Sequence, residues 1–466
     1  MNQAFKKRGL AGIGVLAVSA MVLSGCAADD SNGGDTSTDA DSSGGSSSSE
    51  EVVELNLATV NNPQMVDMES LKGEFEAEYP NIKVNFIVME EGDLRDSVTR
   101  DIATNGGQYD VLTIGAYEVP IWGNNGWLAD LTDLAGNDAE YDVEDILEPV
   151  RAGLSANDRL YAVPFYGESS FTMYNKEIFE EAGLTMPERP TWDEVADLAQ
   201  QIVEGGYAES GICLRGKPGW GDGVAAMHTV AQTFGGAIYD MDWNPTLNSP
   251  EFVEAIDFYT TLARDYGQAD PVGSSFPECL NNVKNGTSAM WYDATSAAGS
   301  LEAADSPVAG KMGYAYAPVK ETDQSGWLWS WNLAVPATTE KLDEAWTFVR
   351  WATSKEYLQL VGNEIGWANV PPGSRASTYE IPEYQEAASA FADITVEIMN
   401  DVNPSQPGVN PQPWTGIQFV SIPEFQDVGN RLGQDLAPVF AGTATAQEVL
   451  DEAAETYVKD AGDAQK

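Results

Sequence analysis

The chain has 466 residues, 43% of them hydrophobic, and its 73 acidic and 24 basic side chains give a formal net charge of −49. One hydrophobic core usually serves roughly 250 to 300 residues, so this length predicts two lobes. The negative charge repels phosphate backbones and argues against nucleic acid as a partner. A single histidine, His228, and no DxDxDG loop leave no basis for a zinc or calcium site, so we expect neither metal nor cofactor.

Residues 1–26 have the features of an export signal. Lys6, Lys7 and Arg8 precede an apolar run from Leu10 to Leu23, which is too short and too rich in glycine for a membrane span of about 20 residues. The segment ends in Leu-Ser-Gly-Cys, which resembles the bacterial lipobox, where the cysteine is diacylated and becomes the new N-terminus. We therefore expect lipidation of Cys26. An ordinary signal peptide with an incidental cysteine is the alternative.

Residues 27–51 predict a disordered tether. From residue 29 onward this segment contains only Ser, Gly, Asp, Asn, Thr, Glu and one Ala, and such a composition cannot bury apolar surface. A flexible chain of this length spans roughly 25 to 30 Å. The folded part could therefore stand off a membrane and still meet a membrane partner.

Cys213 and Cys279 are the two cysteines that follow Cys26. An even pair in an exported chain favours one disulfide, Cys213–Cys279, because that compartment is oxidising. Two separate buried thiols are the alternative.

Strands and helices alternate at the start of the folded part. The patterns predict a strand from Val52 to Val60, a helix whose apolar residues run from Met68 to Tyr79, an alternating strand from Ile82 to Val88, a turn and cap at Glu90–Asp93, a helix from about Leu94 to Ala103 and a strand from Asp110 to Ile114. Such an order requires parallel pairing with right-handed crossovers, which predicts a layered α/β sheet.

Ligands of such sheets bind beyond the carboxyl ends of the strands. Two loops are therefore candidates, namely Asn61-Asn62 after the first strand and Gly115–Trp122 after the third. Further along, the apolar and aromatic segment Leu160–Lys176 is expected to cross between the lobes, and it carries one acid, Glu168.

The second lobe is expected to begin after this crossing. Its predicted elements include a helix over Thr191–Val203 and a strand over Ala289–Tyr292. The chain is predicted to return at Tyr314–Val319, and Leu333–Pro336 indicates a strand before a helix that packs through Leu342 to Val349. The C-terminal third is predicted to be helical, with Gly and Pro interruptions between Pro404 and Pro423.

The order of motifs along the chain carries a resemblance. After the lipobox-like segment and Asn61-Asn62 come YDVLTIG, LYAVPFYGESSFTMYNKEIFEEAGL and PTWDEV. This order resembles family 1 of the bacterial extracellular solute-binding proteins, which includes maltose-binding protein. Six segments are more specifically similar to the sorbitol/mannitol-binding branch: TIGAYEVPIW, GICLRGKPGWG, AMWYDAT, WLWSWNLAVP, GWANVPPGSR and GIQFVSIPEFQ.

The resemblance implies a two-lobe periplasmic-binding-protein-like α/β fold, in which each lobe is a mostly parallel sheet flanked by helices and the ligand cleft lies between the lobes. It implies an N-terminal lobe of residues 52–164 and 319–367 and a C-terminal lobe of residues 165–318 and 368–466. The implied function is that of a non-catalytic substrate-binding lipoprotein, a monomer lipid-anchored on the outer face of the cell membrane. It would deliver a sorbitol- or mannitol-like sugar alcohol to an ABC permease.

Two alternatives accompany this function. The first is a binder of a different mono- or oligosaccharide, because relatives with similar scaffolds bind different sugars. The second is a secreted glycoside hydrolase that uses Glu168 and Asp293 as its two carboxylates.

A sugar alcohol needs carboxylate, amide and guanidinium partners for its hydroxyls and aromatic rings for its C–H faces. Glu168 is a candidate acceptor, with pairing to a lysine at the hinge as its alternative. Asp293 ends AMWYD and is either a cleft carboxylate or a helix N-cap. Arg215 is expected to bind hydroxyls or to offset either acid.

Aromatic residues are the other candidates. Trp327, Trp329 and Trp331 alternate, so they share one face of an extended chain, and some of them should face the cleft rather than a packed core. The resemblance favours Trp331 and its neighbour Asn332. The remaining candidates for substrate binding are Asn61, Asn62, Tyr117, Tyr166, Trp220, Trp367 and Asn369, with Gln418 as a weaker one.

Overall fold

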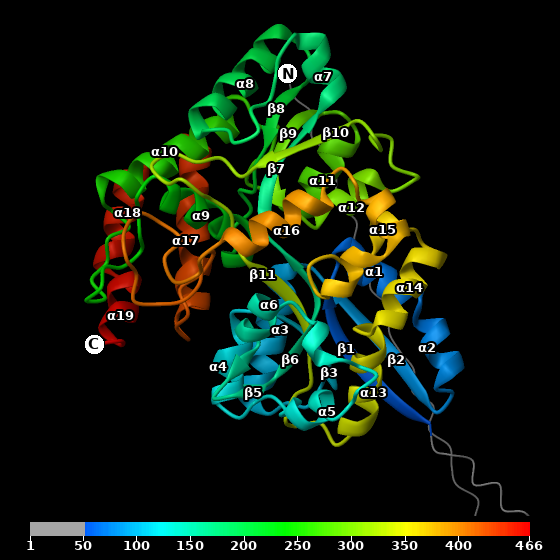
Figure 1. The fold of residues 1–466 in the computed structure, drawn as a ribbon. Coiled ribbons are helices and arrows are strands. Elements are labelled where there is room, and N and C mark those ends of the chain that lie inside the picture. The colour runs from blue at the N-terminus through cyan, green and yellow to red at the C-terminus, as the bar shows by residue number, and fades with distance from the viewer. Residues whose placement is uncertain (1–51) are drawn as a thin grey trace, which may run out of the picture. The chain divides into compact units, whose positions relative to one another are not determined.

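Two large β-sheets organise residues 52–466, which are the residues that the computed structural model describes (Figure 1), and a small third sheet pairs β4 (Ser155–Ala156) with β5 (Arg159–Leu160). The predicted export signal, Cys26 and the tether lie outside these residues. The first sheet has the strand order β2-β1-β3-β11-β6, with bounds Ile82–Met89, Val53–Val60, Val111–Gly115, Trp329–Ala334 and Ala162–Glu168. The second sheet has the order β10-β7-β9-β8, with bounds Met312–Tyr316, Ser170–Asn175, Ser288–Ala294 and Ser210–Cys213.

One strand in each sheet opposes the others. In the first sheet β1 pairs in parallel with β2 and β3, whereas β11 is antiparallel to both β3 and β6. In the second sheet β8 and β9 are parallel, and β7 is antiparallel to β9 and β10. The predicted α/β architecture of two mostly parallel sheets is therefore confirmed.

We call the first sheet with the helices packed on it the first lobe. Its helices are α1 (Pro63–Ser70), α2 (Lys72–Glu78), α3 (Glu91–Thr104), α4 (Glu118–Asn124), α5 (Thr132–Gly136), α6 (Glu148–Gly153), α13 (Leu342–Ala352) and α14 (Lys355–Glu364). The strand β1 alternates until its last four residues, which are all buried, so α3 and α13 cover it. Figure 1 shows these helices around the five-stranded sheet.

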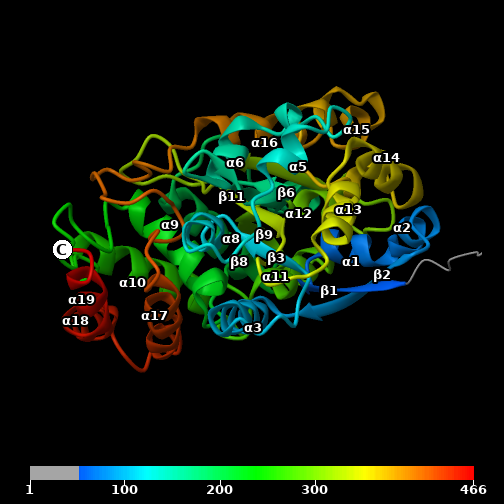
Figure 2. The same cartoon turned by 90° about the horizontal axis from the view of Figure 1, so that it is seen from below.

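The second lobe is built on the four-stranded sheet. Its helices are α7 (Lys176–Ala182), α8 (Trp192–Gly205), α9 (Ala225–Thr233), α10 (Pro250–Asp265), α11 (Phe276–Lys284), α12 (Ala297–Glu302), α17 (Phe425–Phe440), α18 (Ala446–Glu455) and α19 (Tyr457–Asp463), with a π-helical turn η2 at Trp220–Val224. The helices α17 and α18 pack on α10, as Figures 1 and 2 show. The helices α15 (Pro382–Ala387) and α16 (Ala392–Asp401) lie between α14 and α17 in the chain.

Local signals explain where elements begin and end. The helix α8 starts at a capping box formed by Thr191 and Glu194, and its apolar face is buried. The predicted helix around Met68–Tyr79 is instead two helices, which are interrupted at Leu71. The helix α3 starts at Glu91, earlier than expected, with Glu90 at its N-cap, and Glu91 forms an (i, i+4) ion pair with Arg95 in its first turns.

The chain crosses between the sheets at Ser169. This residue separates β6 from β7 and exchanges hydrogen bonds with Thr295: its N donates to Thr295 Oγ1 at 3.1 Å, and its carbonyl accepts from Thr295 N at 2.8 Å. The strand β6 runs through the boundary at residue 164 that the sequence suggested. The exact division of the chain into lobes stays a prediction.

Two further features concern the described residues 52–466. No helix in this part of the chain combines the length and the apolar character needed to cross a membrane. No group of three or more His, Cys, Asp or Glu side chains in it is arranged to hold a metal ion.

Candidate functional site

A cavity lies where the first lobe faces the second, and we call it the central cavity. Its walls combine acids, arginines, amides and indole rings, contributed by Asn62, Glu91, Arg95, Glu168, Arg215, Trp220, Gly221, Ala225, Phe276, Trp329, Trp331 and Gln418. Five of the residues predicted to bind substrate therefore line it, namely Asn62, Glu168, Arg215, Trp220 and Trp331. Gln418, the weaker candidate, lines it as well.

Glu168 is the last residue of β6 and is 5% exposed. Its Oε2 accepts a hydrogen bond from Ser296 Oγ at 2.5 Å. Burial raises the pKa of Glu168 to about 8, although the Ser296 hydrogen bond and Arg215 oppose the rise. Among residues 52–466 no lysine or arginine forms an ion pair with Glu168. Hinge pairing with a lysine is therefore not what this structure shows.

Arg215 and Asp293 form a buried ion pair in the second lobe. Asp293 is 0% exposed, and its two oxygens accept from Arg215 Nε at 2.7 Å and Nη2 at 2.5 Å. It also accepts from Trp291 Nε1 at 3.0 Å. The Asp293 carboxylate is thus turned toward Arg215 within β9, and it is neither a wall of the cavity nor a helix cap.

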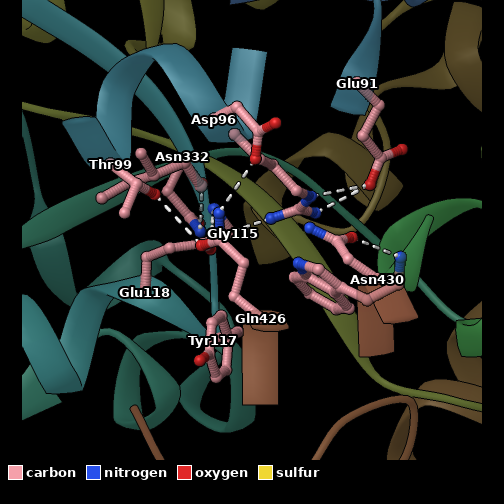
Figure 3. A network of polar contacts seen from close by, with 12 residues as sticks. Glu91, Asp96, Thr99, Gly115, Tyr117, Glu118, Asn332, Gln426 and Asn430 are labelled. Carbon is pink, nitrogen blue, oxygen red and sulfur yellow. Dashed lines mark hydrogen bonds and ion pairs between the residues drawn. The ribbon is translucent and has the colours of Figure 1, made fainter. Parts of the chain in front are cut away.

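Arg95 supplies the second guanidinium, from α3 of the first lobe. Glu91 Oε1 accepts from Arg95 Nε at 3.0 Å and Nη2 at 2.8 Å, and Glu118 of α4 accepts from Nη1 (Figure 3). Glu118 is itself fixed by the Gly115 N–H, at 3.0 Å. Burial would lower the pKa of Arg95, but Glu118 and Glu91 outweigh that effect and raise it.

Three indole rings surround this guanidinium. Its central carbon lies 4.0 Å from the ring centroid of Trp220 in the second lobe, 4.9 Å from Trp331 and 5.2 Å from Trp329 in the first. Trp329 and Trp331 alternate along β11, so both project to the same side of the sheet. The cavity therefore has an aromatic wall with a buried cation–π contact across the lobes.

Four of the predicted residues contact the lining residues without lining the cavity themselves, namely Tyr166, Tyr117, Asn332 and Asp293. Asn62 Nδ2 donates to the hydroxyl of Tyr166 at 2.8 Å, which holds Asn62 at the end of β1. The Tyr117 ring packs 5.1 Å from Trp220, and its hydroxyl donates to the Ile422 carbonyl at 2.9 Å. Asn332 donates to the Ile114 and Ser330 carbonyls. Asp293 holds the lining residue Arg215 in place through two hydrogen bonds.

Three of the predicted residues lie away from the cavity. Asn61 is exposed at the end of β1. Trp367 and Asn369 are half-buried in the 3₁₀ turn η3 (Trp367–Asn369), which packs on α12 and α14. None of the three is among the lining residues.

The lining residues that the sequence does not predict are Glu91, Arg95, Gly221, Ala225 and Phe276. A signal was available for the first two, because an acid and an arginine four residues apart follow β2 at the carboxyl edge of the sheet, where ligands of such sheets bind. Phe276 begins α11 and lies 5.5 Å from the Arg215 guanidinium. Nothing in its local sequence marks it as a site residue.

The structure links Cys213 and Cys279 by a disulfide. Cys213 ends β8, two residues before Arg215, and Cys279 lies three residues after Phe276 on α11. The crosslink therefore joins the two segments that carry these lining residues.

The chain is similar in sequence to a known family and to known proteins. The family described as bacterial extracellular solute-binding protein matches residues 62–359. A mannitol-binding protein of Pseudomonas aeruginosa is 42% identical over 409 residues, which cover 87% of this chain and 92% of that protein.

Solved structures of solute-binding proteins also match this chain. An ABC transporter solute-binding protein of Agrobacterium vitis S4 with bound D-mannitol matches with a TM-score of 0.86 and 44% identity, covering 89% of this chain and 99% of that one. A second, from Agrobacterium radiobacter K84 in complex with ribitol, matches with a TM-score of 0.78 and 26% identity, covering 89% and 99%.

Proposed function

Because this chain belongs to the bacterial extracellular solute-binding protein family, we propose that it captures a sugar alcohol, with D-mannitol as the first candidate, for an ABC importer. The observation that supports D-mannitol as the ligand is the similarity to a mannitol-binding protein, at 42% identity over 87% of the chain. The solute-binding protein that is 44% identical and holds D-mannitol supports the same ligand.

The chemistry of the central cavity suits a neutral polyol. Hydroxyl groups both donate and accept, and Glu168, Arg215 and the Asn62 amide offer both kinds of partner. Within residues 52–466, the buried Oε1 of Gln418 has no protein donor, so a ligand hydroxyl can satisfy it. The indole rings can pack on the C–H face of the ligand.

The charges of the cavity favour a neutral ligand over an anionic one. Arg95 is paired with Glu91 and Glu118, and Arg215 is paired with Asp293. Neither guanidinium is therefore an uncompensated positive charge that would hold the carboxylate of a sugar acid or the phosphate of a sugar phosphate.

The glycoside hydrolase alternative requires two carboxylates at the reacting bond. Both oxygens of Asp293 are occupied by Arg215, and Asp293 does not line the cavity, so it is not available as a nucleophile or base. We propose that the protein is a binder and not an enzyme.

The first test is titration of the purified protein with D-mannitol, sorbitol, ribitol and maltose, followed by tryptophan fluorescence. Because Trp220, Trp329 and Trp331 line the cavity, binding is expected to change the emission. We expect saturable binding of one polyol per chain, with the polyol recovered unchanged and no response to maltose. Binding of maltose without any polyol would favour the other sugar-binding alternative, and a released product would favour the hydrolase.

We propose further that Cys26 carries a lipid anchor that holds a monomeric protein on the outer face of the cell membrane, next to its permease. We expect the substitution Cys26→Ser to move the protein from the membrane fraction to the soluble fraction, because no acylated cysteine remains. Immunoblotting of both fractions after a salt wash measures this. Ser31→Ala, in the predicted tether, is the control that stays on the membrane, and a Cys26→Ser variant that stays there too would contradict the anchor.

A further inference from the structure

Gly221 of the second lobe lies next to the Glu91–Arg95 pair of the first. A Cβ atom at Gly221 would lie 1.9 Å from Glu91 Oε1 and 2.9 Å from Arg95 Nε, and both distances are shorter than a van der Waals contact. Gly221 belongs to η2, and its φ is not positive, so alanine is compatible with its backbone. The need for glycine here thus comes from the opposite lobe.

The atoms that face Gly221 cannot retreat without breaking other contacts. Glu91 Oε1 accepts two hydrogen bonds from Arg95, at 3.0 and 2.8 Å. The guanidinium of Arg95 is in turn held by Glu118 and lies 4.0 Å from the ring centroid of Trp220. A methyl group at Gly221 must therefore separate Glu91 from Arg95 or move α3 away from η2.

Other contacts join α3 to the second lobe, and we call this junction the α3 seam. Glu90 immediately precedes α3, and its Oε2 lies 2.5 Å from Lys217 Nζ of the second lobe. Gln426 of α17 accepts from Thr99 Oγ1 at 3.1 Å and donates to Asp96 Oδ1 at 3.3 Å, and Figure 3 shows these residues side by side. The Gly221 carbonyl accepts from Arg215 Nη1 at 3.2 Å, so the seam connects both arginines of the cavity.

We infer that Gly221 is a positioning residue, whose missing side chain lets the α3 seam form and so brings Arg95 and Arg215 into one cavity. The seam is the contact that must form for the two walls to enclose a ligand together. For its ligand readout this inference rests on the proposed function, whereas the contact itself can be measured without any ligand.

The test compares Gly221→Ala with Gly73→Ala. Gly73 lies in α2, and its Cβ would have nothing within 4 Å, so it is a matched control for a glycine in a helix. A zero-length carbodiimide can couple Lys217 to Glu90, whose side chains are 31% and 60% exposed and hence open to the reagent. Peptide mass spectrometry measures the yield of this crosslink with and without D-mannitol, and fluorescence titration measures the affinity for D-mannitol.

In Gly221→Ala we expect a several-fold lower crosslink yield and an affinity for D-mannitol that is roughly 5- to 150-fold weaker, the range that overpacking a tight contact produces. The melting temperature without ligand is expected to match that of Gly73→Ala where α3 moves away from η2, because the Glu91–Arg95 pair within the first lobe then stays intact, and to fall below it where Glu91 separates from Arg95. Glu91→Ala removes the nearest clashing atom, so adding Gly221→Ala to it is expected to cost little further affinity.

The outcomes separate the inference from the proposed ligand. If the parent protein forms the crosslink but does not bind D-mannitol, the ligand is wrong, and the crosslink yield of Gly221→Ala still decides the role of Gly221. The inference is overturned if the parent forms no crosslink, or if Gly221→Ala forms it as the parent does. It is also overturned if D-mannitol affinity survives the loss of the crosslink, or if the effect of Gly221→Ala is the same with and without the Glu91 side chain.

Discussion

Replacing Arg215 by alanine is expected to lower the free energy of unfolding by about 3 to 5 kcal/mol, because it leaves a buried carboxylate without its counterion. Asp293 is 0% exposed and accepts two hydrogen bonds from Arg215, at 2.7 and 2.5 Å. In the variant, only Trp291 Nε1 and the Ala294 N–H remain to stabilise the charge. The midpoint of unfolding in urea, at an unchanged slope, measures the loss.

Two controls isolate the buried charge as the cause. Arg159→Ala removes an exposed pair with Asp130, whose side chains are 60% and 36% exposed, and is expected to cost about 0 to 1 kcal/mol. Arg215→Met combined with Asp293→Asn removes both charges, and it is expected to recover most of the lost stability. An Arg215→Ala variant as stable as Arg159→Ala would show that Asp293 does not depend on this partner.

Much of the fold could be predicted because its signals are local. Alternation in Ile82–Val88 and helical spacing in Thr191–Val203 correspond to β2 and α8. The break at Leu71 has no such signal, because the apolar spacing continues across it from Met68 to Phe75. Periodicity reports which face of the chain is apolar, and it does not report whether the helix axis changes direction.

The candidate site divides in the same way. Asn62 and Glu168 line the cavity and could be chosen from their positions at the end of a strand and in a crossing segment. Asp293 was also chosen at a strand end, yet it is directed to Arg215. Arg215 is expected from the sequence to offset either acid, and the structure pairs it with Asp293. Which of the two acids it meets depends on a contact between residues 78 positions apart, which no local pattern contains.

Arg95 was missed for a related reason. Its pairing with Glu91 is a local (i, i+4) contact, and such pairs usually lie on solvated helix faces. Arg95 belongs to the candidate site because four residues from three other segments of the chain surround its guanidinium, namely Glu118, Trp220, Trp329 and Trp331. Trp367 and Asn369, which are also candidates from the sequence, lie in η3, away from the cavity.

Replacing Glu168 by glutamine is expected to weaken D-mannitol binding in a manner that depends on pH. Burial raises the pKa of Glu168 to about 8, so without ligand the carboxyl is mostly protonated below that value. A protonated carboxyl and a carboxamide both offer one acceptor oxygen and a donor. At about pH 6 the parent and Glu168→Gln should therefore bind D-mannitol with nearly equal affinity.

Above its pKa, Glu168 is ionised and accepts hydroxyl hydrogen bonds at charge-assisted strength, which glutamine cannot do. Such a bond is worth about 1.5 to 3 kcal/mol, so at about pH 9 the affinity of Glu168→Gln should be roughly 10- to 150-fold weaker than that of the parent. Calorimetric titration across this range measures the ratio, with Glu74→Gln, an exposed acid on α2, as the control that stays equal to the parent. A ratio near one at about pH 9 would mean that the ligand does not bind the Glu168 carboxylate. A ratio that is large and constant with pH would mean that the carboxyl is already ionised at about pH 6 and that its burial does not control its charge.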